Sequence, residues 1–212
     1  MLRIGLLFAG YLLGLIQSGY IMGRTRKMDI REHGSGNAGT TNALRVMGKK
    51  AGLIVFLGDY LKALIPCLIV RSLFGDAQFG LVFVYIFYTG LGVILGHNYP
   101  FYLGFKGGKG VASTAGVLSA IDPRLLLACA LTFLCIAALT RFVSLASILM
   151  MLVFMGLCFF FSGRGDYGLG AGELMEFRIL SAAIGLQSIY RHKENMKRLL
   201  RGSENKLDFS KK

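Results

Sequence analysis

The stretch FVSLASILMMLVFMGLCFFF, residues 142–161, contains no charged side chain over its whole length. A helix needs about twenty predominantly apolar residues to cross the roughly 30 Å hydrocarbon core of a bilayer. A soluble domain has no use for so much apolar surface, because positions that face water need polar cover. The stretch therefore predicts a membrane-spanning helix.

Further apolar runs extend this pattern over the chain, which has 212 residues, 54% of them apolar and 17% charged, with a mean hydropathy of +0.59. We predict an all-α polytopic membrane helix bundle of about seven transmembrane helices, with residues 1–212 forming a single domain. The fourth run is short for a full crossing and suits a half-helix or a re-entrant segment. The predicted spans are 3–22, 51–71, 80–97, 111–121, 125–140, 142–161 and 174–190.

The distribution of lysine and arginine predicts the orientation. With the N-terminus outside, the inner connections hold 18 basic residues and the outer ones hold five, and inner loops normally carry the excess. The turn Asp122-Pro123-Arg124 should break the helix, so residues 111–140 count as two spans. A single span there would place the basic C-terminal segment outside. We therefore predict an external N-terminus, a cytoplasmic C-terminus and a first run that is retained rather than cleaved as a signal peptide.

The net charge of +13 does not indicate a nucleic-acid partner, because the basic residues lie between hydrophobic spans rather than on one continuous face. The inner-loop excess and attraction to anionic lipid headgroups explain it. The cysteines are interpreted as packing thiols, since all lie in apolar runs and form no C-x-x-C pair. They are Cys67, Cys129, Cys135 and Cys158.

The first of three inward-facing polar segments covers residues 35–45. Glycines there let the backbone turn tightly around an anion, and an arginine supplies a fork that suits phosphate or carboxylate. An ordinary hydrophilic connection would be richer in Lys and Glu, so we favour a binding function. The candidate residues are Ser35, Gly36, Asn37, Thr41, Asn42 and Arg45.

The second polar segment, residues 104–113, is a glycine-rich turn that leads into a predicted helix. Backbone N–H groups, the helix dipole and lysine ammonium groups together make a phosphate site. It is not a nucleotide-binding P-loop, which needs Gly at position 103 and Ser or Thr at position 110, where this chain has Leu and Gly. A flexible linker would explain the glycines but not the lysines. The candidates are Lys106, Gly107, Gly108, Lys109 and Gly110.

The third polar segment, residues 191–206, places His192 and Asn195 three positions apart. If the last helix runs on, the two share one face and can orient one ligand group, and an imidazole can accept a proton near neutral pH. A basic stop-transfer run would explain the Lys and Arg residues but not these two.

Two smaller features can be interpreted as either structural or functional. Asp59 and Lys62 lie three apart within the second span, where mutual neutralisation is at least as good an interpretation as a direct role. Ser144, in a short inner turn, is a candidate substrate contact, although serine also commonly bonds between helices.

In order and spacing, these segments resemble the motifs of the bacterial acyl-phosphate:glycerol-3-phosphate acyltransferase family, PlsY. The family's first motif matches Ser35 to Arg45, its second matches Gly104 to Ala112 with His97 upstream, and its third matches Arg191 to Lys206. The resemblance covers the whole chain.

The resemblance implies transfer of a fatty acyl group from acyl phosphate to the 1-hydroxyl of glycerol 3-phosphate, which gives lysophosphatidic acid and phosphate in phospholipid biosynthesis. It implies a catalytic set of Ser35, Asn37, Arg45, His192 and Asn195. It implies a substrate-binding set of Gly36, Thr41, Asn42, Lys106, Gly107, Gly108, Lys109, Gly110 and Ser144, with Glu204 in a structural role.

The same resemblance implies a multi-pass protein of the bacterial cytoplasmic (inner) membrane, with its active site toward the cytoplasm. The expected partners are glycerol 3-phosphate, acyl phosphate and membrane lipids, with a functional link to a phosphate acyltransferase that makes acyl phosphate. We expect no metal, no cofactor and no nucleic acid. Acyl phosphate is a mixed anhydride, so neither ATP nor an acyl-serine is needed. The proton acceptor stays open between His192 and a substrate phosphate oxygen.

Two rival functions make different predictions. The soluble-type glycerolipid acyltransferases carry H-x-x-x-x-D, but Ala38, Tyr102 and Lys197 stand five residues after the three histidines. A membrane transporter for an anionic phosphorylated metabolite would also use charges within spans and a broken helix. It predicts polar residues through the full depth and often a repeat, whereas here the polar segments gather on one side.

Overall fold

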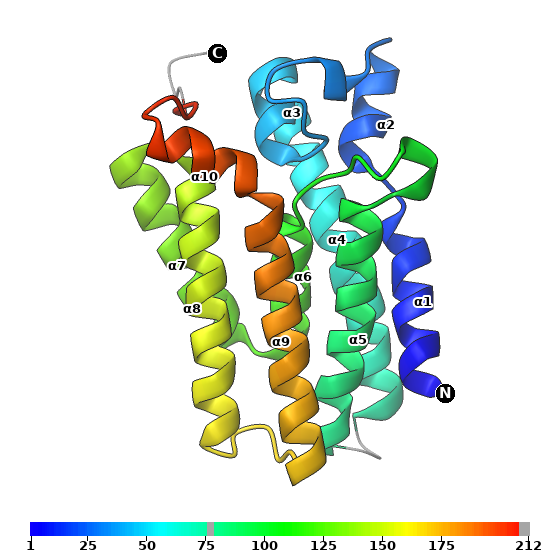
Figure 1. The fold of residues 1–212 in the computed structure, drawn as a ribbon. Coiled ribbons are helices and arrows are strands. Elements are labelled where there is room, and N and C mark those ends of the chain that lie inside the picture. Colours follow the sequence, from blue (N-terminus) through cyan, green and yellow to red (C-terminus); the bar gives the residue numbers. More distant parts are fainter. Residues whose placement is uncertain (76–78, 208–212) are drawn as a thin grey trace.

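The computed structural model describes residues 1–75 and 79–207, and within them every regular element is a helix (Figure 1). The predicted all-α membrane bundle is confirmed. The α-helices are α1 (Leu2–Gly14), α2 (Ser18–Thr25), α3 (Thr40–Met47), α4 (Lys49–Phe74), α5 (Phe79–Asn98), α6 (Val111–Ile121), α7 (Pro123–Thr140), α8 (Val143–Gly163), α9 (Ala171–Arg191) and α10 (Lys193–Leu200), with short 3-10 turns η1 (Ile30–Glu32) and η2 (Phe101–Leu103).

Six of the seven predicted spans each coincide with one helix, the first is divided between two, and five segments of the described chain are long and apolar enough to cross a membrane. α6 is too short for that group, and α9 carries Glu173, Glu176 and Arg178 near its start, which lowers its apolar character. The number of complete crossings and the orientation stay predictions. Lys211 and Lys212, counted among the inner basic residues, lie outside the described residues.

α5 is the most enclosed of the long helices, and it contacts α1, α4, α6 and α9. A helix surrounded on most sides must be apolar all round, and Val84, Ile86, Phe87 and Ile94 are fully buried. α7 and α8 pack together at one side of the bundle. The outer helices instead leave large apolar side chains exposed, as lipid contact requires.

The predicted span 3–22 is broken rather than continuous, because the helix stops after Gly14 and restarts at Ser18. The carbonyl groups released at the break have specific partners. The Tyr102 hydroxyl donates to the Leu15 carbonyl at 2.7 Å, and the Lys62 ammonium donates to the Ile16 carbonyl at 2.6 Å. Side chains that insert in this way satisfy the carbonyls and allow the helix to break inside a membrane.

The predicted turn after α6 is confirmed. Asp122 accepts a hydrogen bond from the backbone N–H of Arg124 at 2.8 Å and so caps α7. Arg124 also reaches Asp166, in the α8–α9 connection, at 2.9 Å. Arg71 of α4 donates to the carbonyls of Ala120 and Ile121 at the end of α6. The far end of α6 therefore meets the end of the bundle that holds the α8–α9 connection.

Candidate active site

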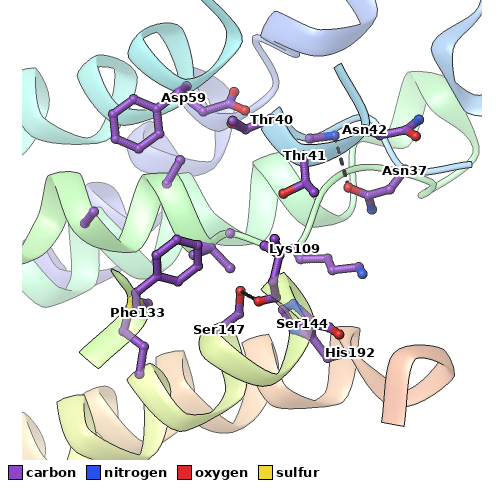
Figure 2. A pocket seen from close by; sticks show the side chains of 18 of the residues that line it. Asn37, Thr40, Thr41, Asn42, Asp59, Lys109, Phe133, Ser144, Ser147 and His192 are labelled. Carbon is purple, nitrogen blue, oxygen red and sulfur yellow. Dashed lines mark hydrogen bonds between the residues drawn. The ribbon is translucent and has the colours of Figure 1, made fainter. Parts of the chain in front are cut away.

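A cavity of about 530 Å³ joins the three polar segments, which are far apart in the sequence. α3 and the loop before it form one wall, the start of α6 forms the floor, and α8 and the α9–α10 junction form the opposite wall (Figure 2). Ten of the predicted site residues line it, namely Ser35, Asn37, Thr41, Asn42, Arg45, Lys109, Gly110, Ser144, His192 and Asn195.

A second cavity of about 400 Å³ shares Ser35, Asn37, Lys109, Asn195 and Arg198 with the first. Three more predicted residues line it, namely Gly36, Lys106 and Gly107. Its lining is strongly cationic, with Arg31, Lys106, Lys109, Arg191, Lys193 and Arg198 against the single carboxylate of Glu194. Gly108 lines neither of these two cavities. The pair of cavities thus forms a positively charged approach to a deeper chamber, which suits an anionic ligand.

Asn42 holds the first polar segment in shape. Its side-chain oxygen accepts from the Ser35 N–H at 2.8 Å, and its amide nitrogen donates to the carbonyls of Ile30 and His33 at 3.1 and 2.9 Å. The side chain is 1% exposed, so these bonds occupy most of its capacity. Arg45 differs, because its guanidinium lines the cavity and has no hydrogen-bond partner among the described residues.

Residues 107–110 are called here the glycine strap. Their backbone N–H groups were expected to bind phosphate, but two of them have partners within the protein. The N–H groups of Gly107 and Gly108 donate to the carbonyls of Asn98 and His97, at 3.3 and 3.0 Å, so they are not free for phosphate. Within the second polar segment, the N–H groups that have no hydrogen-bond partner in the described part of the chain are those of residues 109–113, at and just before the start of α6. A helix N-terminus attracts anions, so the free donors lie one step further along the segment than the glycine pair.

Lys109 is tied to the third polar segment. Its ammonium donates to the Asn195 side-chain oxygen, and the Asn195 amide donates to Glu204 at 2.7 Å. Ser144 and Arg198 donate to the same carboxylate at 3.0 and 2.7 Å. Burial lowers the pKa of Lys109 to about 8; the Glu204 carboxylate opposes this shift and nearby arginines add to it.

Glu204 therefore connects α8, α10 and the strap. Burial of the carboxylate favours its neutral form, but hydrogen bonds from Asn195, Arg198 and Ser144 outweigh that effect and hold the pKa of Glu204 below its ordinary value. The structural role implied for this residue agrees with these contacts and remains a proposal.

His192 lies at the junction of α9 and α10, because α9 ends at Arg191 and α10 starts at Lys193. The last helix does not run on through His192, but His192 and Asn195 still line the same cavity. The His192 Nδ1 atom lies 2.8 Å from the Ser188 carbonyl, which only accepts hydrogen bonds. We therefore assign the ring proton to Nδ1 and a lone pair to Nε2. Burial, followed by the Lys109 charge, lowers the pKa of His192 to about 4, so the ring is neutral at pH 7.

The inner part of the cavity is apolar, and none of the apolar residues that line it was predicted as a site residue. One face of α7 lines it, with residues 126, 129, 130, 133 and 134, together with Phe56 and Tyr60 of α4 and Met150 of α8. Figure 2 shows Phe133 at the opposite end from Asn37, Lys109 and His192. The spacing on α7 is that of one helix face, so the face was visible in the sequence. Its partner helices were not. A chamber with a cationic end and an apolar end fits an amphiphile.

Known proteins share this architecture. The family model described as glycerol-3-phosphate acyltransferase matches residues 4–202. The glycerol-3-phosphate acyltransferase of Aquifex aeolicus (strain VF5) is 41% identical over 201 residues, which cover 95% of this chain and 97% of that protein. The enzyme of the same name from Alkaliphilus metalliredigens (strain QYMF) is 38% identical over 208 residues, covering 98% of this chain and 97% of that protein.

Two crystal structures of PlsY (YgiH), an integral membrane glycerol 3-phosphate acyltransferase, are also similar. The glycerol 3-phosphate form has a TM-score of 0.84 and 39% identity, covering 97% of this chain and 96% of that chain. The lysophosphatidic acid form has a TM-score of 0.81 and 38% identity, covering 97% and 95%. These matches span nearly the full length of both partners. The chain therefore belongs to the glycerol-3-phosphate acyltransferase family and is a multi-pass membrane acyltransferase of phospholipid synthesis.

Proposed function

We propose that the chain transfers the acyl group of acyl phosphate to the 1-hydroxyl of glycerol 3-phosphate, producing lysophosphatidic acid and phosphate. The observation that carries the proposal is one chamber with a cationic polar end and an apolar end in a member of this family. The apolar end accommodates a fatty chain, and the polar end accommodates phosphate. The transporter alternative loses its support with the family assignment.

The cationic end offers three kinds of phosphate contact. Arg45 provides a guanidinium that has no partner within the described part of the chain, Lys109 provides an ammonium, and the start of α6 provides backbone N–H groups. We assign Ser35, Asn37 and Thr41 to the rim that orients the substrates. Gly36, Lys106 and Gly107 belong to the entry side, where the second cavity lies. Asn42, Gly108, Gly110 and Ser144 act by shaping the polar segments.

In the proposed reaction the glycerol oxygen attacks the carbonyl carbon of acyl phosphate, and a new C–O ester bond forms. The bond between that carbon and the bridging phosphate oxygen breaks, and its electrons leave with inorganic phosphate. The hydroxyl proton passes to Nε2 of His192, whose lone pair is free, or to a phosphate oxygen of a substrate. Cations around the cavity stabilise the charge that develops on the phosphate.

We further propose one domain, an external N-terminus and about seven spans in the bacterial inner membrane. The polar segments then face the cytoplasm, where glycerol 3-phosphate is dissolved. The N-terminus lies away from the end that carries α2, α3 and α10, while the described C-terminal segment lies at that end (Figure 1), which is consistent with opposite sides for the two termini. An enzyme that makes acyl phosphate is the partner that this reaction needs.

The decisive experiment supplies purified protein with glycerol 3-phosphate and palmitoyl phosphate and measures lysophosphatidic acid. We expect product from acyl phosphate, and none when acyl-CoA or acyl carrier protein replaces it. Rapid product from either of those donors would place the chain in another donor class.

An Arg45→Ala variant tests the phosphate assignment. A hydrogen bond to a charged group contributes about 1.5–3 kcal/mol, so we expect kcat/KM to fall about 10- to 100-fold. Lys49→Ala is the matched control, since Lys49 is exposed at the start of α4 and lines neither cavity. Wild-type kinetics from Arg45→Ala would remove Arg45 from the site.

A further inference from the structure

A buried group of three titratable side chains lies at the wall of the reaction chamber, and the proposed reaction does not use it directly. Two of its members, Asp59 and His97, line the cavity. Asp59 and Lys62 come from α4 and His97 comes from α5, and their side chains are only 2–5% exposed. The Lys62 ammonium donates to Asp59 Oδ1 at 2.9 Å, to His97 Nδ1 at 2.8 Å and to the Ile16 carbonyl at 2.6 Å. All three protons of the ammonium therefore have acceptors.

These contacts fix the histidine ring. An ammonium can only donate, so Nδ1 of His97 is the acceptor and the ring proton lies on Nε2. The His97 carbonyl is held as well, because the Gln17 amide donates to it at 3.1 Å. Both the side chain and the backbone of His97 are thus fixed by neighbouring helices.

The fixed ring packs directly against the glycine strap. A Cβ atom built on Gly108 would collide with Nε2 of His97, and would stand 2.6 Å from Cε1 and 2.9 Å from Cδ2. The three atoms nearest to that position all belong to this ring. The strap is therefore supported from one side by the edge of the imidazole, at a distance that only glycine permits.

Arg191 holds the strap through the carbonyls of Gly107 and Gly108. Its Nε donates to the Gly108 carbonyl and its Nη2 to the Gly107 carbonyl, each at 3.1 Å, while the guanidinium lies over the Tyr99 ring. Lys109, which reaches into the cavity, is the next residue of the strap. A shift of the strap would therefore move the Lys109 ammonium and the start of α6 together.

We propose that His97, held by Lys62 and Asp59, is a positioning residue. It fixes the position of the glycine strap relative to the chamber and so places Lys109 against substrate phosphate. This inference rests on the proposed function for its kinetic consequence, but its geometry concerns the fold alone. It gives the intramembrane Asp59–Lys62 pair a purpose beyond mutual neutralisation.

A suppressor experiment tests the proposal. Gly108→Ala places a methyl group against the imidazole and must push the strap away from the His97 ring. A displacement of about 1 Å can cost up to a hundredfold in rate, and we expect the KM for glycerol 3-phosphate to rise at least about tenfold. Adding His97→Ala removes the obstructing ring and should recover most of that loss, so that the double variant exceeds Gly108→Ala alone in kcat/KM.

Gly107→Ala is the matched control. Its Cβ would collide with the His97 carbonyl and lie 2.6 Å from Pro100 Cδ, so it meets backbone and proline rather than the imidazole. His97→Ala should therefore not rescue it. Equal rescue of both glycine variants, or rescue of neither, would overturn the proposal.

The charged pair is tested by removing both charges together, because loss of one alone would leave a buried ion. Asp59→Asn with Lys62→Met should raise the KM for glycerol 3-phosphate while kcat stays within about threefold of wild type. Arg3→Met with Glu176→Gln, which removes a pair between α1 and α9 distant from the strap, should leave that KM unchanged. An unchanged KM in the first double variant would also refute the positioning role.

Thermal unfolding of the same variants separates this inference from the proposed function. His97→Ala should raise the melting temperature of Gly108→Ala and not that of Gly107→Ala. That pattern holds whether or not the wild-type protein makes lysophosphatidic acid. A protein that shows this thermal pattern but no acyl transfer would refute the proposed function and leave the positioning role intact.

Discussion

The charge of Lys109 should make binding of substrate phosphate depend on pH. Burial lowers the pKa of its ammonium to about 8, and only the charged form attracts phosphate. As pH rises through that value the charge is lost, so we expect kcat/KM for glycerol 3-phosphate to fall above about pH 8. A pH profile of kcat/KM reports the groups of the free enzyme.

Lys109→Arg is the matched variant for that profile, since a guanidinium stays charged throughout the range. Its alkaline limb should disappear even if its maximum rate is lower. An identical limb in Lys109→Arg would assign the titration to another group. His192, with its pKa lowered to about 4, stays neutral through this range and should not shape the limb.

At the scale of elements, α7 contributes an apolar face to the chamber. Ala130 lines the cavity, whereas Leu131 is 52% exposed on the outer side of the helix. Ala130→Phe should fill part of the apolar end and raise the KM for palmitoyl phosphate more than that for a short-chain acyl phosphate. Leu131→Phe should change neither. A uniform change across chain lengths in Ala130→Phe would mean that the fatty chain lies elsewhere.

Glu204 ties elements together through three donors from α8 and α10. Glu204→Ala leaves those donors unpaired, and we expect it to lower the free energy of unfolding by about 2 kcal/mol. Glu194→Ala is the comparison, because that carboxylate is exposed and, among the described residues, pairs with Lys197 on its own helix, so its loss should leave the free energy of unfolding almost unchanged. The melting temperatures of the two variants measure the difference, and equal values would contradict the central position given to Glu204.

At the level of the whole molecule, the proposed topology places the polar segments on the cytoplasmic side. We expect Arg164→Cys, in the α8–α9 connection, to react with a membrane-impermeant maleimide in intact cells. Lys197→Cys, on α10, should react only in vesicles that expose the inner face. The parent protein gives the background, since its cysteines lie within helices. Reaction of Lys197→Cys in intact cells would invert the proposed topology.

Much of the architecture follows from sequence alone. Apolar runs of membrane-crossing length determine helices, because a chain in hydrocarbon must satisfy every backbone group internally. The Asp122-Pro123 pair determines the turn between α6 and α7, since proline ends one helix and starts the next. The spacing of polar residues also identified ten of the residues that line the chamber.

How those residues are used depends on packing between distant parts of the chain. Packing broke the first span at residues 15–17, where Tyr102 and Lys62 from other elements take its carbonyls. It engaged the N–H groups of Gly107 and Gly108 with α5 and left the free donors at the start of α6. It also brought His97 against the glycine strap. These outcomes depend on contacts between residues distant in the chain, whereas periodicity and propensity describe only neighbours along it.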